Sequence, residues 1–319
     1  MSRGIVMSER SIQSASPLVS VVILARDEEF NIPDCLQSLA GLACEVFVVD
    51  SGSTDRTREI ATKAGATIYE HAFENYSVQR NWAQHNLPLS TSWVLHLDAD
   101  ERLTPQLVQE INVVLREPDP AVHGFLLRKR TVFLGRWIKH GGHYPSYHLR
   151  LFLRDWGLCE KRLYDQHFMV QGSIRRLQHD YIDVLTSDLS TWSKRHVRWA
   201  ELEAEEILGH KGTDGLVIGR PFGTDIERRR WLRNGVYLRT PMFARCFLYW
   251  FYRYFVRFGF LDGEEGLIFH FLQGLWFRLL VDAKLVELRK LRKKHLPTGP
   301  EQFPSDGHRS AETGTPFKY

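Results

Sequence analysis

Long apolar runs, paired cysteines and a surplus of one charge are all missing from this chain, and each absence excludes a class of protein. No run of about 18 uninterrupted apolar residues is present, so a membrane-spanning helix is not expected. The four cysteines show no Cys-x-x-Cys spacing, which argues against structural zinc and fits a reducing compartment. The net charge of +4 comes without a long Lys/Arg block, so composition does not indicate a nucleic-acid partner.

Two phosphate-binding signatures are absent as well. No Gly-x-Gly-x-x-Gly follows the first apolar run and no Walker lysine motif occurs, so neither a dinucleotide-binding fold nor a P-loop is supported. Residues 1–17 are polar and Ser-rich without an apolar core, which predicts a disordered leader rather than a signal peptide. We therefore expect a cytoplasmic protein.

What the chain does have is an alternation of short apolar runs with helical patterns. With 319 residues, 43% of them apolar and 25% charged, it is long enough for one large globular domain plus an appendage. Strands separated by helices of this length predict an α/β domain with a mostly parallel, doubly wound sheet. The expected strands are 19–24, 45–49, 66–69 and 93–97, and the expected helices are 32–42, 54–64 and 77–85.

Acidic residues follow three of these strands. Asp27 and Glu28 follow the first strand, Asp50 ends the second, and Asp98 and Asp100 end the fourth. Side chains alternate along a strand, so the last two carboxylates project on the same side of the sheet. Ligands of open α/β sheets sit at this edge, and paired carboxylates there suit Mg²⁺ or Mn²⁺ with a substrate diphosphate. A lone Asp-x-Asp is a weak signal, and a solvated acidic turn is the alternative.

Four segments together are more specific, because they resemble the successive motifs of glycosyltransferase family 2 in order and spacing. The similarity is greatest to the branch that builds lipopolysaccharide cores and exopolysaccharides. It covers residues 18–120 densely and 120–210 more loosely. The segments are Val-Val-Ile-Leu-Ala-Arg-Asp-Glu-Glu at 21–29, Val-Val-Asp-Ser-Gly-Ser-Thr-Asp at 48–55, Gln-Arg-Asn-Trp-Ala at 79–83 and Leu-Asp-Ala-Asp-Glu at 97–101.

The resemblance implies a GT-A fold, a nucleotide-sugar donor with UDP preferred, and an inverting transfer. Position by position, it places Glu28 or Asp27 beside the nucleotide base and lets Asp50 accept a hydrogen bond from the base. Many relatives have Asn where this chain has Asp27. Arg80 and Asn81 would approach the nucleotide or the sugar.

The same resemblance implies the metal site. Asp98 would lie near the ribose and the donor sugar, and Asp100 would bind Mg²⁺ or Mn²⁺, with Asp98 as the second candidate ligand. The cation would offset charge on the departing diphosphate.

An inverting transfer also needs a base that takes the proton of the acceptor hydroxyl. Asp155, Glu160 and Asp165 are the candidates, and we favour Asp165 because its segment resembles the place where relatives carry a short acidic and histidine motif. The usual Glu-Asp signature is absent, and an ordinary loop carboxylate is the alternative. His167 and His179 are candidates for orienting the base or binding acceptor phosphate, or are structural.

Two further strands and a helix are expected before the appendage. The strands are 123–129 and 147–153, and the loop 135–145 between them is expected to line the acceptor side. A helix over 190–208 carries the basic residues Lys194, Arg195 and Arg198. These form either a solvated helix face or a site for an acceptor diphosphate or lipid headgroup.

The last third of the chain is rich in aromatic residues mixed with arginine. Residues 242–280 suit the headgroup boundary of a membrane, where rings are half hydrated and cations meet anionic lipid, so we expect monotopic attachment to the inner membrane surface. The alternative, which can coexist, is a helical hairpin core. The expected divisions are the leader 1–17, a catalytic domain 18–210, a membrane-associating region 211–295 and a disordered tail 296–319.

The sequence therefore predicts a metal-dependent, inverting glycosyltransferase that moves a hexose from a nucleotide sugar to a lipid-linked or cell-surface glycan, in lipopolysaccharide-core or exopolysaccharide synthesis. Two alternatives stay open: another Mg²⁺-dependent nucleotide or phosphate enzyme, and a non-catalytic membrane-binding scaffold.

Overall fold

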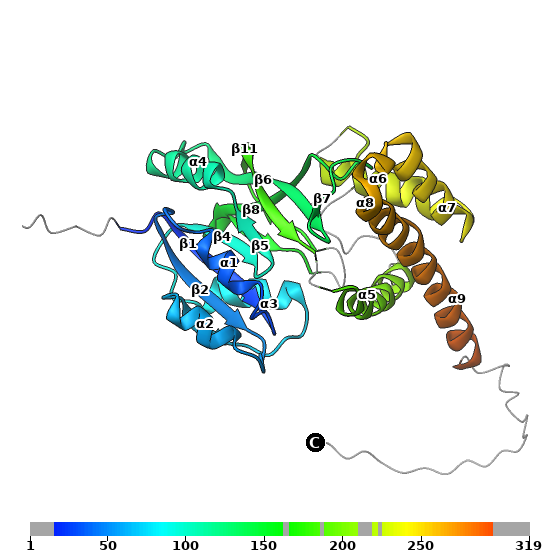
Figure 1. Cartoon of the computed structure of the whole chain (residues 1–319), viewed down its shortest axis with the longest axis horizontal. Coiled ribbons are helices and arrows are strands. Elements are labelled where there is room, and N and C mark those ends of the chain that lie inside the picture. Colours follow the sequence, from blue (N-terminus) through cyan, green and yellow to red (C-terminus); the bar gives the residue numbers. More distant parts are fainter. Residues whose placement is uncertain (1–15, 162–165, 186–187, 210–218, 223–224, 296–319) are drawn as a thin grey trace, which may run out of the picture.

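One curled β-sheet forms the centre of the molecule, and helices cover it and extend from it (Figure 1). The structure is a computed structural model that describes residues 16–161, 166–185, 188–209, 219–222 and 225–295. Most of the predicted leader and all of the predicted tail lie outside the described residues. The α/β class and the mostly parallel character of the first half are confirmed.

The first half of the sheet consists of four parallel strands in the order β3-β2-β1-β4. Between them run helices that begin close to where the sequence predicts. The second helix starts later than expected, because the Asp55 carboxylate accepts hydrogen bonds from the backbone and hydroxyl of Thr57 at 2.9 and 2.5 Å. The bounds are β1 Val19–Ala25, α1 Ile32–Gln37, β2 Cys44–Asp50, α2 Thr57–Lys63, β3 Thr67–Glu70, α3 Tyr76–Asn86 and β4 Trp93–Asp98.

The second half of the sheet is mixed, and it bends back toward the first. Its order is β4-β8-β6-β11-β5, with β6 and β11 parallel and the other neighbours antiparallel. β9 and β10 form a separate two-stranded sheet. The bounds are β5 Glu101–Leu103, α4 Pro105–Arg116, β6 Val122–Phe133, β7 Arg136–Trp137, β8 Ser146–Leu153, η1 Arg154–Trp156, β9 Gly157–Cys159, β10 Phe168–Val170 and β11 Ser173–Val184.

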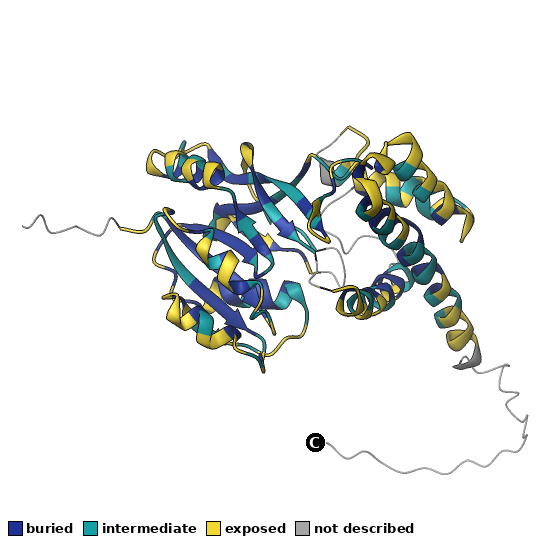
Figure 2. Ribbon diagram, viewed as in Figure 1, coloured by how far each residue is buried: buried dark blue, intermediate teal, exposed yellow. Residues whose placement is uncertain are grey.

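Alternation along the central strands gives the sheet a separate apolar core on each face. Val21 and Ile23 of β1 pack with residues of α1, α2 and α4, such as Ile111. Val22, between them, points to the opposite face and packs with Ala83 of α3. The strands are accordingly buried along most of their length, whereas the helices expose their outer faces (Figure 2).

The C-terminal helices lie beside the open side of the sheet and pack on each other. Ala200 and Ala204 of α5 contact Phe277 and Leu285 of α9, so the two helices join across the domain boundary expected at residue 210. Among the described helices, none combines the length and the apolarity needed to cross a bilayer. The bounds are α5 Leu189–Gly209, α6 Asp225–Gly235, η2 Tyr237–Arg239, α7 Ala244–Phe251, the π-helical turn η3 Tyr252–Val256, η4 Gly259–Asp262, α8 Gly263–Phe269, the π-helical segment η5 His270–Trp276 and α9 Phe277–His295.

Candidate active site

The strand register brings the predicted acidic residues to one edge of the sheet. β1 lies between β2 and β4, with Ala25 opposite Asp50 on one side and Leu24 opposite Asp98 on the other. The carboxyl ends of these three strands therefore meet where ligands bind in open α/β sheets.

Asp98, the last residue of β4, is held by two arginines. Nη2 of Arg80 on α3 lies 2.9 and 3.0 Å from its two carboxylate oxygens, and Nη2 of Arg150 on β8 lies 3.0 Å from Oδ2. Burial raises the pKa of Asp98, but the two guanidinium groups outweigh it and keep that pKa below its ordinary value. Arg80 and Arg150 therefore fix the position of the Asp98 carboxylate. Its assignment as a metal ligand stays a prediction.

Asp100, two residues later, is in the opposite situation. Its carboxylate is half-buried, and among the described residues no side chain forms a hydrogen bond or ion pair with it. Burial and the negative charges of Asp183, Asp98, Glu101 and Glu28 raise its pKa well above the ordinary value. An ionised carboxylate in such surroundings is costly unless a cation lies beside it.

These surroundings fit a hard divalent cation. Mg²⁺ and similar ions use one or two protein carboxylates together with water and substrate phosphate oxygens, rather than a complete protein cage. Within the described part of the chain, no cluster of three or more His, Cys, Asp or Glu side chains that could hold a metal ion is found. Asp100 would hold the cation, and the remaining ligands would come from the donor and water.

Four residues form ion pairs beside these two aspartates, and of the four only Glu101 belongs to a motif recognised in the sequence. Arg150 bridges Asp98 and Glu101, whose other carboxylate oxygen accepts the backbone N–H of Asp98 at 2.9 Å. Asp183 of β11 accepts a hydrogen bond from Lys129 of β6 at 2.7 Å. Arg150 lies between Leu149 and Leu151 in a buried strand. A charged residue inside an apolar run is the sequence feature that could have indicated its role.

Asp27 and Asp50, at the ends of β1 and β2, form hydrogen bonds that hold the loops after these two strands. The Asp50 carboxylate is fully buried and accepts the backbone N–H groups of Gly52 and Ser53 at 3.0 and 2.9 Å, together with the Ser53 hydroxyl. Asp27, with φ of 53°, accepts the backbone N–H of Thr54 at 2.7 Å. Base recognition by Asp50 and Asp27 therefore stays a prediction, and both carboxylates already support the loop conformation.

Glu28 lies on the side of these loops that faces the metal-site acids. Its Oε2 accepts a hydrogen bond from Asn31 at 2.7 Å, and burial raises its pKa. Its charge acts on Asp100, as noted above. The fold thus gathers Glu28, Asp98 and Asp100 in one electrostatic unit, as the sequence predicts for the donor site.

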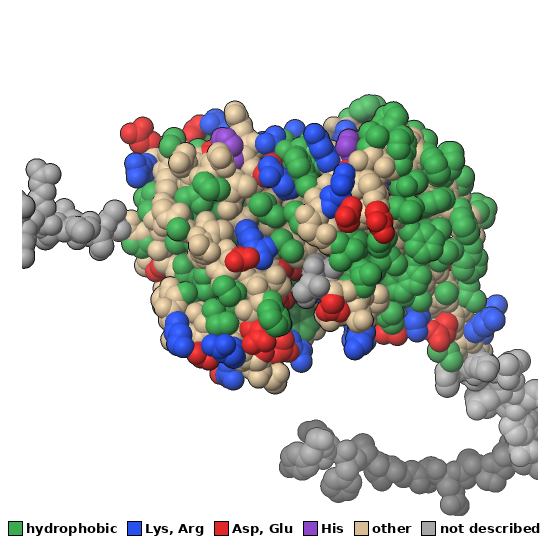
Figure 3. Space-filling model, viewed as in Figure 1, with side chains coloured by type: hydrophobic (Ala, Val, Ile, Leu, Met, Phe, Trp, Pro, Cys, Tyr) green, Lys and Arg blue, Asp and Glu red, His purple; other side chains and the backbone are tan. Residues whose placement is uncertain are grey.

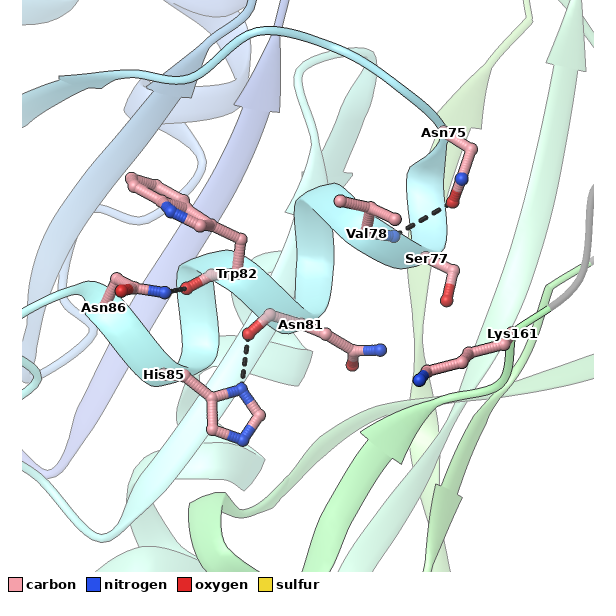
Figure 4. Close-up of a pocket in the computed structure, with 8 residues that line it drawn as sticks. All are labelled: Asn75, Ser77, Val78, Asn81, Trp82, His85, Asn86 and Lys161. Carbon is pink, nitrogen blue, oxygen red and sulfur yellow. Dashed lines mark hydrogen bonds between the residues drawn. The ribbon is translucent and has the colours of Figure 1, made fainter. Parts of the chain in front are cut away.

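Asn81 has a structural role that the sequence did not reveal. Its amide donates to the backbone oxygen of Cys159 and accepts the Cys159 N–H, both at 2.9 Å, which ties α3 to β9. It also lines a pocket of about 580 Å³ on the outside of α3, where Ser77 and Lys161 face it (Figure 4). None of the acidic residues above lines this pocket. Nucleotide contact by Asn81 stays a prediction.

Two of the three base candidates fall within the described residues. The Asp155 side chain is 82% exposed and pairs with the neighbouring Arg154. Glu160 is buried and pairs with Arg230 and His167, so its carboxylate is neutralised by protein groups. Asp165, the favoured base, lies outside the described residues. Because neither alternative offers a carboxylate that is both sheltered and free of cation partners, the preference for Asp165 is kept as a proposal.

The two candidate histidines are engaged by neighbouring acids. His167 lies 3.2 Å from Glu160 through Nδ1, and His179 lies 2.8 Å from Glu110, on the helix side of the sheet. A direct catalytic role for either stays a prediction.

Of the basic residues on α5, Arg195 reaches the acidic unit. Its Nη2 donates to the backbone oxygen of Leu185 at 2.8 Å, and its positive charge acts on Glu28. Lys194 and Arg198 are exposed, and Arg198 pairs with Glu201 at 3.5 Å. Arg195 is therefore the α5 cation whose charge acts on the acidic unit, while Lys194 and Arg198 lie exposed, and anion binding by these residues stays a prediction.

Comparison with known proteins agrees with this geometry. The model of the family described as Glycosyl transferase family 2 matches residues 20–188. An uncharacterised glycosyltransferase of Rickettsia conorii is 25% identical over 288 residues, covering 89% of this chain and 93% of the relative. The lipopolysaccharide core biosynthesis glycosyltransferase LpsC of Rhizobium meliloti is 32% identical over 123 residues, covering 37% of this chain and 44% of the relative.

A solved structure supports the fold. The mannosyltransferase PcManGT of Pyrobaculum calidifontis, in complex with GDP-Man and Mn²⁺, superposes with a TM-score of 0.50 at 16% identity, covering 88% of each chain. Together with the strand-end carboxylates, the curled α/β sheet and the family match, these comparisons show that the chain is a glycosyltransferase with a GT-A fold and belongs to glycosyltransferase family 2.

Proposed function

We propose that this glycosyltransferase is metal-dependent and inverting, and that it moves a hexose from a nucleotide sugar, with UDP as the preferred nucleotide, to a lipid-linked or cell-surface glycan. One observation carries the metal and donor part. The carboxylate of Asp100 lies among other acids and has no ion-pair partner among the described residues, whereas Asp98, two residues away, is neutralised by Arg80 and Arg150. The Mn²⁺ and GDP-Man bound by PcManGT support it.

Different residues would bind different parts of the donor. Glu28 and the loops joined by Asp50 and Asp27 would form the nucleotide end of the site. Asp100 would hold Mg²⁺ or Mn²⁺, which when bound offsets charge on the leaving diphosphate. Arg195 would contact the same diphosphate from α5.

The acceptor hydroxyl would lose its proton to Asp165 as its oxygen attacks the anomeric carbon. The C–O bond to the diphosphate breaks as the new glycosidic bond forms, and the diphosphate leaves with the electron pair.

Donor hydrolysis without acceptor tests the proposal. The full chain is incubated with Mn²⁺ or Mg²⁺ and a panel of UDP- and GDP-sugars, and release of nucleoside diphosphate is measured. We expect slow hydrolysis of one donor, dependent on the metal and lost in Asp100→Asn. Hydrolysis of a nucleotide without transfer of any sugar would favour another nucleotide enzyme, and no turnover of any donor would favour a scaffold.

The location of the acceptor is proposed from the surface of α7 and the segments after it. Apolar side chains that are 44–62% exposed follow each other along one side of this region and form a continuous apolar face on the right of Figure 3. We call this set the aromatic face: Phe247, Leu248, Phe251, Phe255, Val256, Phe258, Phe260 and Leu261. Other rings of the region, such as Phe269 and Phe277, are buried in helical cores, which is the second use expected for the aromatic residues.

An exposed apolar face of this kind marks a binding surface, and rings with flanking arginines suit the membrane interface. We therefore propose peripheral attachment to the inner face of the cell membrane through residues 242–280. The partial likeness to LpsC supports a role in lipopolysaccharide-core or exopolysaccharide synthesis.

Vesicle sedimentation tests the attachment. Replacing Phe247, Phe251 and Phe255 with serine should weaken binding to phosphatidylglycerol vesicles by about tenfold or more, because each ring would otherwise leave water. Phe30→Ser is the control, since Phe30 is 79% exposed and lies in the β1–α1 loop. Equal binding by the triple variant and the control would contradict the proposal.

A further inference from the structure

Two arginines from separate segments lie beside Tyr249 on α7, and the charge of a third acts on it. Nη1 of Arg253, on η3, lies 2.6 Å from the Tyr249 hydroxyl, and the guanidinium carbons of Arg253 and Arg278 lie 5.4 and 5.8 Å from the ring centre. Burial raises the pKa of Tyr249, but the charges of Arg253, Arg278 and Arg229 outweigh this and lower it. The region around this hydroxyl is strongly positive.

Acidic side chains compensate only part of this charge. Arg278 pairs with Glu203 at 2.9 Å, but the same oxygen also pairs with Arg233 on α6. Arg253 donates from Nε to the backbone oxygen of Gly141 at 2.6 Å, and its Nη2 atom is buried without an acceptor among the described residues.

Arg229 on α6 has no acidic partner in the described part of the chain either. Both of its terminal nitrogens lie 3.3 Å from the hydroxyl of Ser146 on β8. That hydroxyl is also 3.3 Å from Nε2 of His148. Burial and the nearby charges of Lys129, Arg150, His167 and Arg229 hold the pKa of His148 well below its ordinary value, so the imidazole is neutral and adds no charge.

This arrangement suits a phosphate group. The buried Nη2 atom of Arg253, which has no acceptor among the described residues, is costly to keep, and the cost is removed when an anion accepts its hydrogen bond. Arginine presents paired N–H groups that match phosphate oxygens, and a hydroxyl and an imidazole nearby add further polar contacts.

The cationic region is connected to the acids of the donor site but is separate from them. The charge of Lys129 acts on His148, and the same Lys129 pairs with Asp183, whose charge acts on Asp100. The region therefore lies on the side of the donor site formed by β6, β8 and the C-terminal helices.

Resting on the proposed transferase function, we infer that Arg229, Arg253 and Arg278 bind a phosphate group carried by the acceptor, as a phosphate ester or diphosphate on its sugar or lipid part. The juxtaposition with the aromatic face, which begins on the same helix as Tyr249, fits an acceptor that enters from the membrane side.

Calorimetry with inorganic phosphate tests the inference on the full chain. Titrations are made without nucleotide and again with Mg²⁺ and the nucleoside diphosphate that the donor assay selects, so that the donor site is filled. We expect phosphate to bind in both conditions and to bind about tenfold or more weakly in Arg229→Gln and Arg253→Gln. Arg239→Gln, an exposed arginine of η2, is the matched control and should bind as the wild type does.

Two outcomes overturn the inference: no phosphate binding by the wild type, or equal weakening in all three variants. Because Arg229 is exposed, its variant should fold even if Arg253→Gln does not, and thermal unfolding checks both. Titrations with glucose 6-phosphate and decyl phosphate then distinguish a phosphate on a sugar from one on a lipid. The compound whose binding is weakened in Arg229→Gln identifies which kind of phosphate the site takes. Donor hydrolysis by the wild type is measured separately, so a failed transferase function is told apart from a failed phosphate site.

Discussion

Arg80 lies within 2.9 and 3.0 Å of both carboxylate oxygens of Asp98, whereas Asp100 has no such partner among the described residues. Two aspartates that differ by two positions in the sequence therefore have different electrostatic surroundings. The first is neutralised by the protein and positions the strand end. The second is the carboxylate that we propose as the metal ligand.

Replacing Asp100 by asparagine keeps the size of the side chain and removes its charge. Metal-dependent donor turnover should fall by about a hundredfold or more, since charge stabilisation by a bound cation contributes several kcal/mol. The free energy of unfolding without metal should not decrease, because repulsion from Asp183 and Glu101 is removed. Glu117→Gln, at the exposed end of α4, should keep normal turnover. Unimpaired turnover by Asp100→Asn would disprove the metal role.

Asp165→Asn tests the base. Transfer to acceptor should decrease by about 10²- to 10⁴-fold, the range of general-base catalysis, while the Kd for the donor stays the same. Asp155→Asn should transfer at nearly the wild-type rate, because its side chain is 82% exposed and already pairs with Arg154. If the losses were reversed, Asp155 would be the base.

Arg150→Met should destabilise the fold. Arg150 is 7% exposed and bridges Asp98 and Glu101, so its loss leaves the buried Glu101 carboxylate without its cation and Asp98 with Arg80 alone. Breaking a buried pair from one side costs roughly 3–5 kcal/mol, which urea unfolding would detect. Arg56→Met removes an exposed pair with Glu59 and should change stability little. Similar midpoints for the two variants would show that the Asp98–Arg150–Glu101 bridge is not a buried ion-pair network.

His196 should make stability depend on pH. It is 3% exposed, its Nε2 lies 2.9 Å from the side-chain amide of Gln273, and burial lowers its pKa to about 4. Between pH 6.5, the ordinary pKa of histidine, and pH 4, the unfolded chain binds more protons at this position than the folded chain does. The contribution of His196 to the free energy of unfolding is therefore complete above pH 6.5 and is lost as the pH falls toward 4. The loss attributable to His196 should reach up to about 3 kcal/mol.

His196→Gln should reduce the acid-induced loss of unfolding free energy by the share of one histidine, because His270, whose pKa burial also lowers to about 4, keeps its own share. His85→Gln, a substitution of an exposed histidine of α3, should leave the profile unchanged. A profile for His196→Gln that matches the wild type would show that another group causes the acid sensitivity.

The first four strands and three helices were predictable because their signals are local. Each strand is an apolar run bounded by polar residues, as Val19–Ala25 illustrates, and the motifs at their ends carry the family resemblance. The structure brings Glu28, Asp98 and Asp100 close enough for their charges to interact, because carboxyl ends of parallel strands share one edge; their roles in the donor site stay a prediction.

The long strand β11 was not predicted, and β6 extends beyond its predicted end, for a reason that single-strand periodicity cannot show. Arg128 and Arg130 on β6 pair with Asp180 on β11 at 2.5 and 2.6 Å, and Lys129 pairs with Asp183. Charges that interrupt each strand's pattern are neutralised by partners on the other strand, which lie 50 to 54 residues away in sequence.

The neutralisation of Asp98 and the anchoring of Asn81 were hidden for the same reason. Arg150 and Cys159 reach these residues only after the sheet has curled, since β4 and β8 become neighbours through antiparallel pairing. Non-local contacts of this kind leave no local signature.

The placement of β5 limits how this enzyme can be divided. Only Ala99 and Asp100 separate β4 from β5, yet β5 lies at the far edge of the strand order and pairs with β11, with Glu101 opposite Asp183. A fragment that stops after α4 would retain both aspartates but lose Arg150, Lys129 and Asp183. The turn at Asp100 connects β4 to β5, and the strands that separate these two in the sheet, β8, β6 and β11, all come later in the chain. A chimera that exchanges the Asp100 region should therefore exchange all strands up to β11 together.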